Sequence, residues 1–215
     1  MPDIQIDEEE MGRWQDELAE QYENDVRTGV HLSDLQLCLR QSPLSKLYAP
    51  KWDLVTLFRF RMGNALEKAF FKSLLPVATE EMEVVQDGVE GHIDFGTDPL
   101  DYECKLTWSK KKEPEVLLDE KFWWFERMGW YTHMRHRVEM RLTVLFLFPI
   151  PDLVCYRVGW DEDELLDSWE IMLERKAYVE ERAAMKELPD KTHLTWLCRG
   201  CPVKQPCDTL AARGE

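Results

Sequence analysis

The sequence lacks any apolar run long enough to cross a lipid bilayer. Its acidic N-terminus also lacks the positive charge and apolar core of a secretory signal peptide. It contains no internal repeat and no low-complexity tract, and 215 residues are enough for one sizeable domain with an ample core. The sequence therefore excludes a membrane-spanning protein and a repeat array, and we expect a soluble, cytoplasmic chain.

Positive charge is scarce. Lysine and arginine total 27 against 42 aspartates and glutamates, which gives a net charge of −15. A nucleic-acid-binding protein normally needs a basic footprint, so the overall charge argues against one. Basic residues nevertheless cluster, at Arg59 and Arg61, at Lys110, Lys111 and Lys112, and at Arg135, Arg137 and Arg141. An acidic exterior around a narrow basic groove would favour single strands and free ends over duplex. The alternative is a mixed surface with chance basic clusters.

The cysteines are few and unevenly placed. In a reducing compartment, 6 cysteines favour metal or cluster ligation over disulfides. Three of them form a C-x₂-C-x₅-C group at Cys198, Cys201 and Cys207, which needs a fourth ligand. Cys104 and Cys155 fall in expected strands, the latter as a core thiol, so Cys38 is the best fourth candidate. Structural zinc and an iron–sulfur cluster both accept four cysteines, and the residues leave both open.

Residues 91–105 carry the densest chemistry. A strand containing Asp94 is followed by a Gly/Asp/Pro turn and a second strand that contains Glu103 and Lys105. Residues two apart on a strand point to the same face, and a hairpin would bring Asp94 beside Glu103. Two convergent carboxylates suit Mg²⁺ or Mn²⁺, and a nearby ammonium can hold a phosphate. The alternative is a polar hairpin with its charges in solvent.

Hydrophobic periodicity predicts the remaining elements. An acidic helix in residues 1–30 has Met11, Trp14, Leu18 and Tyr22 at helical spacing; we expect this stripe to pack on the domain, with docking to a protein partner as the alternative. We expect a short helix capped by Ser33-Asp34, further helices over residues 53–75, 118–135 and 161–188, three strands within 80–106, two strands at 138–148 and 153–158, and an irregular tail from Pro189.

Two of the expected helices carry residues of interest. Gly63 lies inside the helix over residues 53–75, where a glycine costs about 1 kcal/mol relative to alanine, so we expect a packing or site reason for it. Glu67 follows one turn later. The helix over residues 118–135 is dense in aromatic residues, most of which should be core, and it contains Arg127 and Tyr131.

The order of these motifs resembles the RecB-like branch of the PD-(D/E)xK nuclease superfamily, and in particular the cluster-bearing CRISPR-associated exonuclease family. The resemblance rests on Asp94 followed by Glu103-x-Lys105, on the glycine–glutamate pair in the preceding helix, on Tyr131, and on the cysteine pattern. It implies an α/β fold with a mixed central sheet flanked by helices. It also implies three segments: an acidic extension (1–30), a nuclease core (31–188) and a C-terminal cysteine segment (189–215) that packs with Cys38.

The same resemblance implies roles for residues. Glu67, Asp94, Glu103 and the backbone carbonyl of Cys104 would hold Mg²⁺ or Mn²⁺, and Lys105 would orient or activate a water. Tyr131 matches the tyrosine of a Q-x-x-x-Y motif, while Arg127 replaces the glutamine and would contact phosphate in its place. Cys38, Cys198, Cys201 and Cys207 would hold a 4Fe–4S cluster. Independently of the resemblance, the basic cluster of Lys110, Lys111 and Lys112 near the expected site is predicted to bind DNA.

The sequence thus predicts a metal-dependent DNA nuclease, acting on single-stranded DNA or DNA ends, with a structural 4Fe–4S cluster. Two other interpretations stay open. One is a catalytically weak DNA-binding or scaffold module of the same fold. The other is a zinc-stapled interaction protein in which the E-x-K spacing is accidental.

Overall fold

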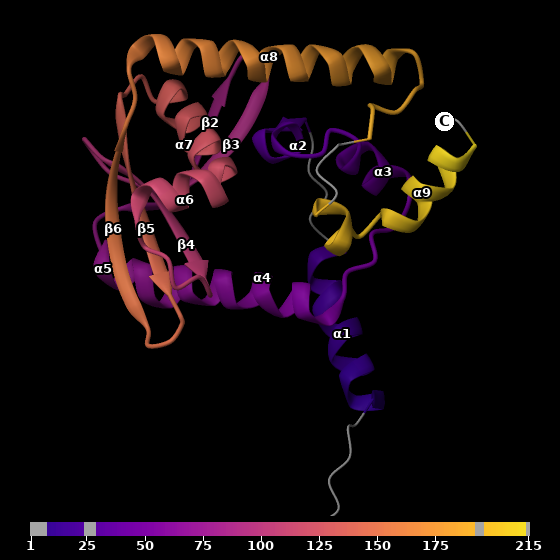
Figure 1. Ribbon diagram of the computed structural model, residues 1–215, viewed down its shortest axis with the longest axis horizontal. Helices are drawn as coiled ribbons and strands as arrows, with labels where there is room; N and C mark the ends of the chain where they lie inside the picture. Colours follow the sequence, from indigo (N-terminus) through magenta and orange to yellow (C-terminus); the bar gives the residue numbers. More distant parts are fainter. Residues whose placement is uncertain (1–7, 24–28, 192–195, 214–215) are drawn as a thin grey trace, which may run out of the picture.

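The structure is a computed structural model that describes residues 8–23, 29–191 and 196–213, and its centre is a six-stranded mixed β-sheet (Figure 1). The strand order is β1-β3-β4-β5-β6, and β2 also pairs with β3. The β4–β5 pair is parallel, whereas β2–β3, β3–β4 and β5–β6 are antiparallel. The strands are β1 (Val30–His31), β2 (Thr79–Gln86), β3 (Val89–Gly96), β4 (Asp101–Thr107), β5 (Glu139–Phe146) and β6 (Asp152–Gly159). The mixed α/β fold and the three strands within residues 80–106 agree with the prediction.

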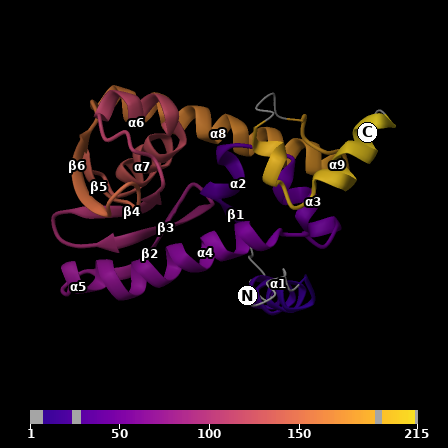
Figure 2. The same ribbon diagram turned by 60° about the horizontal axis from the view of Figure 1, so that its bottom comes forward.

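Helices cover both faces of the sheet (Figure 2). On one face, α7 (Phe122–Met134) and α8 (Glu162–Ala184) pack with the sheet around a large apolar core that includes Ile93, Trp130 and Leu142. On the other face, α4 (Leu54–Leu66) and its continuation cover a smaller core around Phe71 and Phe95. Every helix in the described ranges is too short or too polar to span a bilayer.

The helix predicted over residues 53–75 is present, but its geometry changes at the site. Asp53 caps α4 by accepting a hydrogen bond from the Thr56 amide at 3.0 Å. The chain then forms a π-helical turn, η1 (Glu67–Phe71), before the short α5 (Lys72–Leu74). Turns of this kind occur often at functional sites because the extra residue reorients side chains. Glu67 is the first residue of this turn.

The aromatic helix predicted over residues 118–135 is two helices. Pro114 occupies the first turn of α6 (Pro114–Glu120). Lys121 has a non-helical backbone (φ −132°), which ends α6 before α7 begins. The bulky aromatics divide accordingly. Trp124, Trp130 and Tyr131 are buried, whereas Phe122 at the break is 41% exposed.

The N-terminal helix α1 (Glu8–Glu23) contacts α4, but the stripe predicted to pack on the domain is only partly covered, since Met11 is 40% and Trp14 is 48% exposed. Trp14 and Leu18 line a groove with Leu54, Val55 and Phe58 of α4. The side-chain amide of Gln15 donates a hydrogen bond to the backbone carbonyl of Trp52 at 2.9 Å. The side chain of Tyr22, the last residue of the predicted stripe, lies outside the described part of the structure.

Two segments far apart in the sequence, α3 (Gln41–Leu47) and α9 (Lys204–Ala212), lie side by side (Figures 1 and 2). Leu44, Val203 and Cys207 form a buried cluster between them. The prediction of an irregular tail was wrong, because the described part contains η2 (Leu197–Gly200) and α9. Pro206 does not prevent α9, since it lies in the first turn, where a missing amide breaks no helical hydrogen bond.

Two further predictions need correction. The helix α2 (Leu32–Gln36) is capped at His31 and not at Ser33-Asp34, because Asp34 lies inside the helix and accepts a hydrogen bond from the His31 amide at 3.4 Å. Cys155 is exposed and is not a core thiol. Its strand, β6, lies at the edge of the sheet, and its successive side chains point to opposite faces. Val154 and Tyr156 therefore face the core, while Cys155 faces outward.

Candidate active site

The site lies where β3 and β4 separate. The two strands are paired only at Phe95 with Tyr102 and at Gly96 with Asp101. Beyond that point the side chain of Asp94 replaces the backbone ladder, since its Oδ2 accepts a hydrogen bond from the amide of Cys104 at 2.7 Å. The separation of the strands therefore leaves room for side chains between them, and Asp94 lies beside Glu103, as the hairpin prediction required.

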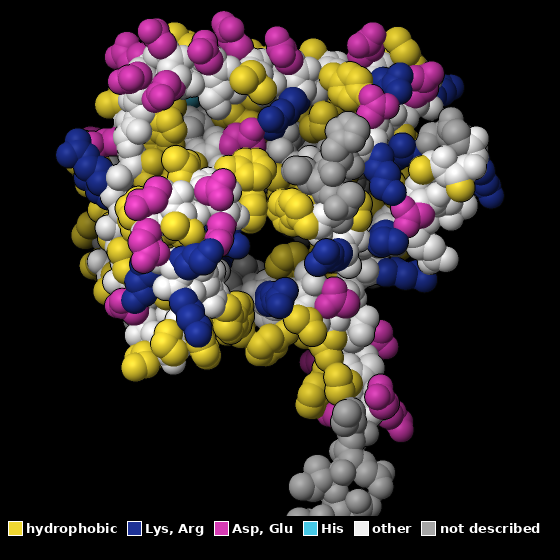
Figure 3. Space-filling view, in the orientation of Figure 1, with side chains coloured by type: hydrophobic (Ala, Val, Ile, Leu, Met, Phe, Trp, Pro, Cys, Tyr) yellow, Lys and Arg dark blue, Asp and Glu magenta, His cyan; other side chains and the backbone are white. Residues whose placement is uncertain are grey.

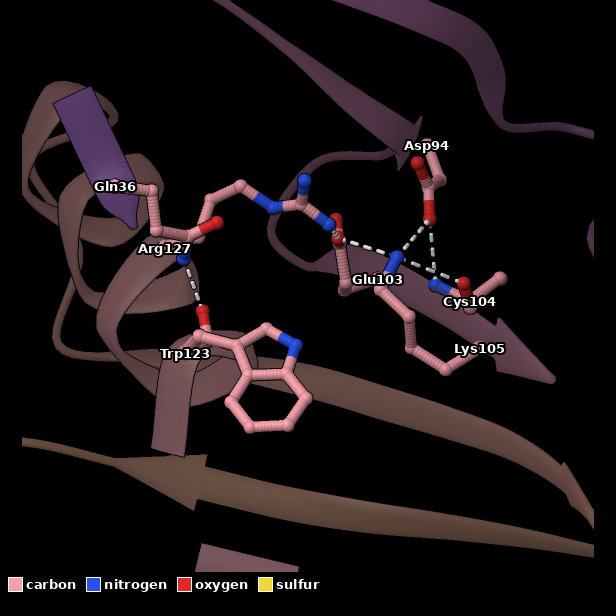
Figure 4. A network of polar contacts seen from close by, with 7 residues as sticks. All are labelled: Gln36, Asp94, Glu103, Cys104, Lys105, Trp123 and Arg127. Atoms are coloured by element: carbon pink, nitrogen blue, oxygen red, sulfur yellow. Dashed lines mark hydrogen bonds and ion pairs between the residues drawn. The ribbon is translucent and has the colours of Figure 1, made fainter. Parts of the chain in front are cut away.

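The ammonium of Lys105 occupies the centre of this gap (Figure 4). Its Nζ lies 2.6 Å from Glu103 Oε1 and 3.5 Å from Asp94 Oδ2. It also donates a hydrogen bond to the backbone carbonyl of Cys104 at 3.0 Å. Three oxygens that the sequence predicts as metal ligands thus already surround one positive charge.

A second cation reaches Glu103 from α7. Nη2 of Arg127 lies 2.6 Å from Glu103 Oε1, and Figure 4 shows the guanidinium pointing at that carboxylate. Tyr131, one turn further along α7, is buried, and its hydroxyl bonds to the backbone of His92. A Cβ atom on Gly91 would lie 2.6 Å from the Tyr131 ring, so this close approach requires glycine. The structure pairs Arg127 with a carboxylate, where the sequence predicted a contact with phosphate.

Burial and charge set the protonation of the central pair. Burial opposes ionisation of Glu103, but the nearby cations of Lys105 and Arg127 outweigh it and lower the pKa of the carboxyl. Burial alone would lower the pKa of the Lys105 ammonium, but the carboxylates of Asp94 and Glu103 raise it. At neutral pH the pair is therefore an ionised carboxylate against a charged lysine.

Glu67 belongs to the same electrostatic environment. Burial, followed by the negative charge of Asp94, raises the pKa of Glu67 to about 7, and the charges of Lys105 and Glu103 also act on it. Burial and the Glu103 carboxylate likewise raise the pKa of Asp94. Three carboxyl groups thus share a site whose two cations are both directed at Glu103. An additional positive charge would relieve this repulsion.

The donor set fits a hard divalent cation. The oxygens that surround Lys105 Nζ show that the site accepts a cation, and Glu103 Oε2 is buried without a hydrogen-bond partner. Carboxylate and carbonyl oxygens are the ligands that Mg²⁺ and Mn²⁺ prefer. With the side chains as they stand, no group of three or more His, Cys, Asp or Glu residues in the described ranges is arranged to hold a metal ion.

Most residues of the predicted basic clusters form ion pairs with carboxylates. Lys111 and Lys112 form ion pairs with Glu120 and Asp152. Arg135 and Arg137 pair with Asp101, and Arg141 pairs with Glu139, so these three arginines serve structural ion pairs near the start of β4 and not an open basic patch.

Two cations contact exposed aromatic rings instead. The Nζ of Lys110 lies 4.5 Å from the ring centre of Phe148, and the guanidinium of Arg59 lies 5.9 Å from that of Trp108. The sequence analysis did not single out these rings. The sequence feature that could have indicated them is an aromatic residue, Trp108, two residues before the run of three lysines.

The four cysteines expected to act together surround one small cavity. Cys38, Cys198, Cys201 and Cys207 all line it, next to Arg40 and Lys191. Burial raises the pKa of the Cys201 thiol, and the other three thiols raise it further. Cys104 and Cys155 lie elsewhere, in β4 and β6. The fold therefore brings together the early cysteine and the C-terminal group that are nearly the whole chain apart in sequence.

Comparisons with known proteins identify the fold. No protein-family model matches the sequence, and no curated protein matches it. Among solved structures, the protein SSO0001 is similar with a TM-score of 0.59 and 14% identity, over 88% of this chain and 91% of that one. A phage-related exonuclease from Haemophilus somnus 129PT is similar with a TM-score of 0.53 and 14% identity, over 76% of this chain and 99% of that one. The mixed sheet and its helices thus form a fold that is also found in an exonuclease.

Proposed function

We propose that this chain is a metal-dependent DNA nuclease that hydrolyses phosphodiester bonds in single-stranded DNA or at DNA ends. The observation that carries the proposal is the convergence of Asp94, Glu103 and Lys105 in the gap between β3 and β4. Glu67 lies close enough for the charges of these three residues to shift its pKa. The exonuclease of similar fold supports the same reaction class. The resemblance of the motif order to the RecB-like nucleases adds a further, independent argument.

The residues would share the work as follows. Asp94, Glu103, Glu67 and the Cys104 carbonyl would hold Mg²⁺ or Mn²⁺, which when bound lowers the pKa of a water and neutralises charge on the phosphate. Lys105 now donates hydrogen bonds to three of these oxygens. With metal and substrate bound, its ammonium would donate to the attacking water and the phosphate instead. Arg127 would keep Glu103 ionised and correctly oriented, and Tyr131 would hold α7 against Gly91 of β3.

We further propose that Cys38, Cys198, Cys201 and Cys207 hold a structural 4Fe–4S cluster. The support is their common cavity and the packing of α3 against α9. Iron–sulfur clusters are held by four cysteine thiolates, so the number and type of donors fit. Structural Zn²⁺ takes the same donors and is the alternative. Anaerobic purification separates them, since a cluster gives brown protein with iron and sulfide, while zinc gives colourless protein.

The nuclease proposal is tested with end-labelled single-stranded DNA. The intact protein should shorten the labelled strand when Mg²⁺ or Mn²⁺ is present and should be inactive in EDTA. Glu103→Gln and Lys105→Ala should each lower the rate by at least about 100-fold, since each removes a group that acts on the reacting phosphate or its metal.

A matched control is Lys176→Ala, because Lys176 lies on α8 and pairs with Glu180 outside the site. It should keep the wild-type rate within about twofold. Thermal melting of each variant shows whether a loss of rate reflects lost chemistry or lost fold. Cleavage by the Lys105→Ala variant at the wild-type rate would contradict the assignment of the site. A wild-type protein that binds DNA but never cuts it would identify a scaffold module.

A further inference from the structure

We propose that Trp108 and Phe148, each with a cation against its ring, form a stacking platform for the bases of single-stranded DNA beside the nuclease site. The inference rests on the proposed nuclease function and adds where, and in what form, the strand is held. It concerns the surface where the loop after β4 meets the end of β5 and the middle of α4. We call these four residues, Arg59, Trp108, Lys110 and Phe148, the platform.

The two rings are more exposed than packing requires. Trp108 is 49% exposed and Phe148 is 45% exposed, although both adjoin strands whose other large apolar side chains are buried or partly buried. Leu147 nevertheless bonds through its amide to the carbonyl of Thr107 at 2.9 Å, so the residue before each ring is fixed to the other strand. The platform therefore consists of two exposed rings on backbone that is held in place.

The cations beside the rings supply the positive charge that a nucleic-acid site needs for the phosphates. Lys110 and Arg59 lie over the rings and, unlike Lys111 and Lys112, form no ion pair in the described structure. Proteins that bind single strands combine positive charge for the phosphates with aromatic faces for the bases. A ring and a cation in contact can hold one base and its adjoining phosphate together.

Two separate elements place the platform at similar distances from the site. Arg59 precedes Glu67 by eight residues along α4, which corresponds to about 12 Å of helix. Trp108 follows Lys105 by three residues, which corresponds to about 10 Å of extended chain. A stacked strand advances about 3.4 Å per nucleotide. The platform would therefore hold bases about three nucleotides from the phosphate at the site.

On the face drawn in Figure 3, the surface over the elements that carry the platform differs from the surface over α8. In Figure 3, hydrophobic and basic side chains lie together along the lower edge, over α4 and the tip of the β5–β6 hairpin, while acidic side chains gather over α8 at the upper edge. For a chain with a net charge of −15, a polyanion meets less repulsion at this lower edge than over α8. The rings select an unpaired strand, because the base faces of a duplex are already stacked.

The test measures binding without chemistry. Fluorescence anisotropy of a labelled ten-nucleotide oligo-dT, in EDTA, gives the dissociation constant for the intact protein. Trp108→Ala and Phe148→Ala should each weaken binding about 5- to 150-fold, the range for loss of one base–aromatic stack. Trp108→Phe should restore most of the affinity. Phe122→Ala is the matched control, since Phe122 is 41% exposed on α7, and it should bind within twofold of wild type.

A second arm needs no variant. An abasic strand of the same length keeps the phosphates and removes the bases, so wild type should lose both stacks and bind it more weakly than Trp108→Ala binds oligo-dT. Trp108→Ala should bind the abasic strand no more weakly than wild type does. Equal affinity of wild type for both strands, or of wild type and both alanine variants for oligo-dT, would overturn the platform.

The nuclease proposal is assessed separately, with hydrolysis of bis(p-nitrophenyl) phosphate, which is too small to reach the platform. If the platform variants keep this activity and lose oligo-dT affinity, both proposals stand. If wild type never hydrolyses it, nor DNA, while the ring variants still lose affinity, the platform stands and the nuclease proposal fails.

Discussion

The guanidinium of Arg127 lies 2.6 Å from the carboxylate of Glu103. Glu103 is almost fully buried, so this contact, together with the one from Lys105, offsets the cost of holding a charge in the core. An arginine in this position therefore stabilises the metal-free protein, whatever else it does for a substrate.

Arg127→Gln tests that role. The variant removes one of two cations from a buried carboxylate but leaves an amide that can donate one hydrogen bond. We expect the free energy of unfolding at pH 7 to fall by about 1–3 kcal/mol, measured by urea denaturation in EDTA. The matched control is Arg157→Gln, since Arg157 is 74% exposed and pairs with Glu139; it should cost less than about 1 kcal/mol. Equal, small effects of both changes would show that the Arg127 contact contributes nothing.

Glu67 should make the metal-free protein less stable as the pH rises. Its pKa in the folded protein is about 7, against about 4.3 in an unfolded chain, so between these values the folded state binds more protons. Its contribution is therefore fully present below about pH 4 and is lost as the pH rises through 7. Because the side chain is partly exposed, we expect an effect on the order of 1–2 kcal/mol between pH 5 and 8.

Glu67→Gln should flatten this pH dependence, whereas Glu83→Gln, at an exposed strand position, should not. Mg²⁺ should raise the free energy of unfolding of the wild type at pH 8, and it should raise that of Glu67→Gln by less. Glu67→His should shift the metal preference toward Mn²⁺, because imidazole is a softer ligand than carboxylate. An unchanged metal dependence in both variants would remove Glu67 from the site.

Gly63 offers a test of substrate approach. A Cβ atom at this position would have no neighbour within 4 Å, so the expected packing reason for the glycine is absent from the described structure. Gly63→Ala should therefore raise the free energy of unfolding by about 0.5–1 kcal/mol. If the open space one turn before Glu67 admits the strand, the same variant should cut DNA more slowly. Gly12→Ala in α1, where a Cβ is equally free, should stabilise without changing the rate.

The cysteine variants should divide into two groups. Serine at Cys38, Cys198, Cys201 or Cys207 should give colourless protein with a lower melting temperature, because the proposed cluster would join Cys38 to the C-terminal segment across a long loop. Cys155→Ser should keep full iron and unchanged melting, since Cys155 is exposed. Cys104→Ser should keep iron as well, although its buried position makes some loss of stability expected. Full iron in the Cys38 variant would show that the fourth ligand lies elsewhere.

The sequence predicts the convergence of Asp94, Glu103 and Lys105 because that information is local. The alternation of a strand places Glu103 and Lys105 on one face, and a short turn returns the chain so that Asp94 meets them. Helical periodicity likewise places Glu67 after Gly63 on one continuous helix. None of these inferences depends on which distant segments pack together.

The features that the sequence did not reveal depend on tertiary packing. Cys155 lies in an apolar run, and its exposure follows only from β6 being the edge of the sheet. The partner of Arg127 depends on how α7 lies over β4. Trp108 looks like one more core aromatic until α4 and β5 fix its surroundings. The break at Lys121 has no proline or glycine beside it to mark it.

The acidic side chains of α8, which cover the edge opposite the platform, bear on how the protein would work along a strand (Figure 3). On the proposed platform only two cations, Arg59 and Lys110, would contact the strand, so few counterions would be released on binding and affinity should depend only weakly on salt. Repulsion from the rest of the surface favours release after each encounter. The chain by itself should therefore be distributive, and sustained, processive degradation would require a second component that keeps the DNA close.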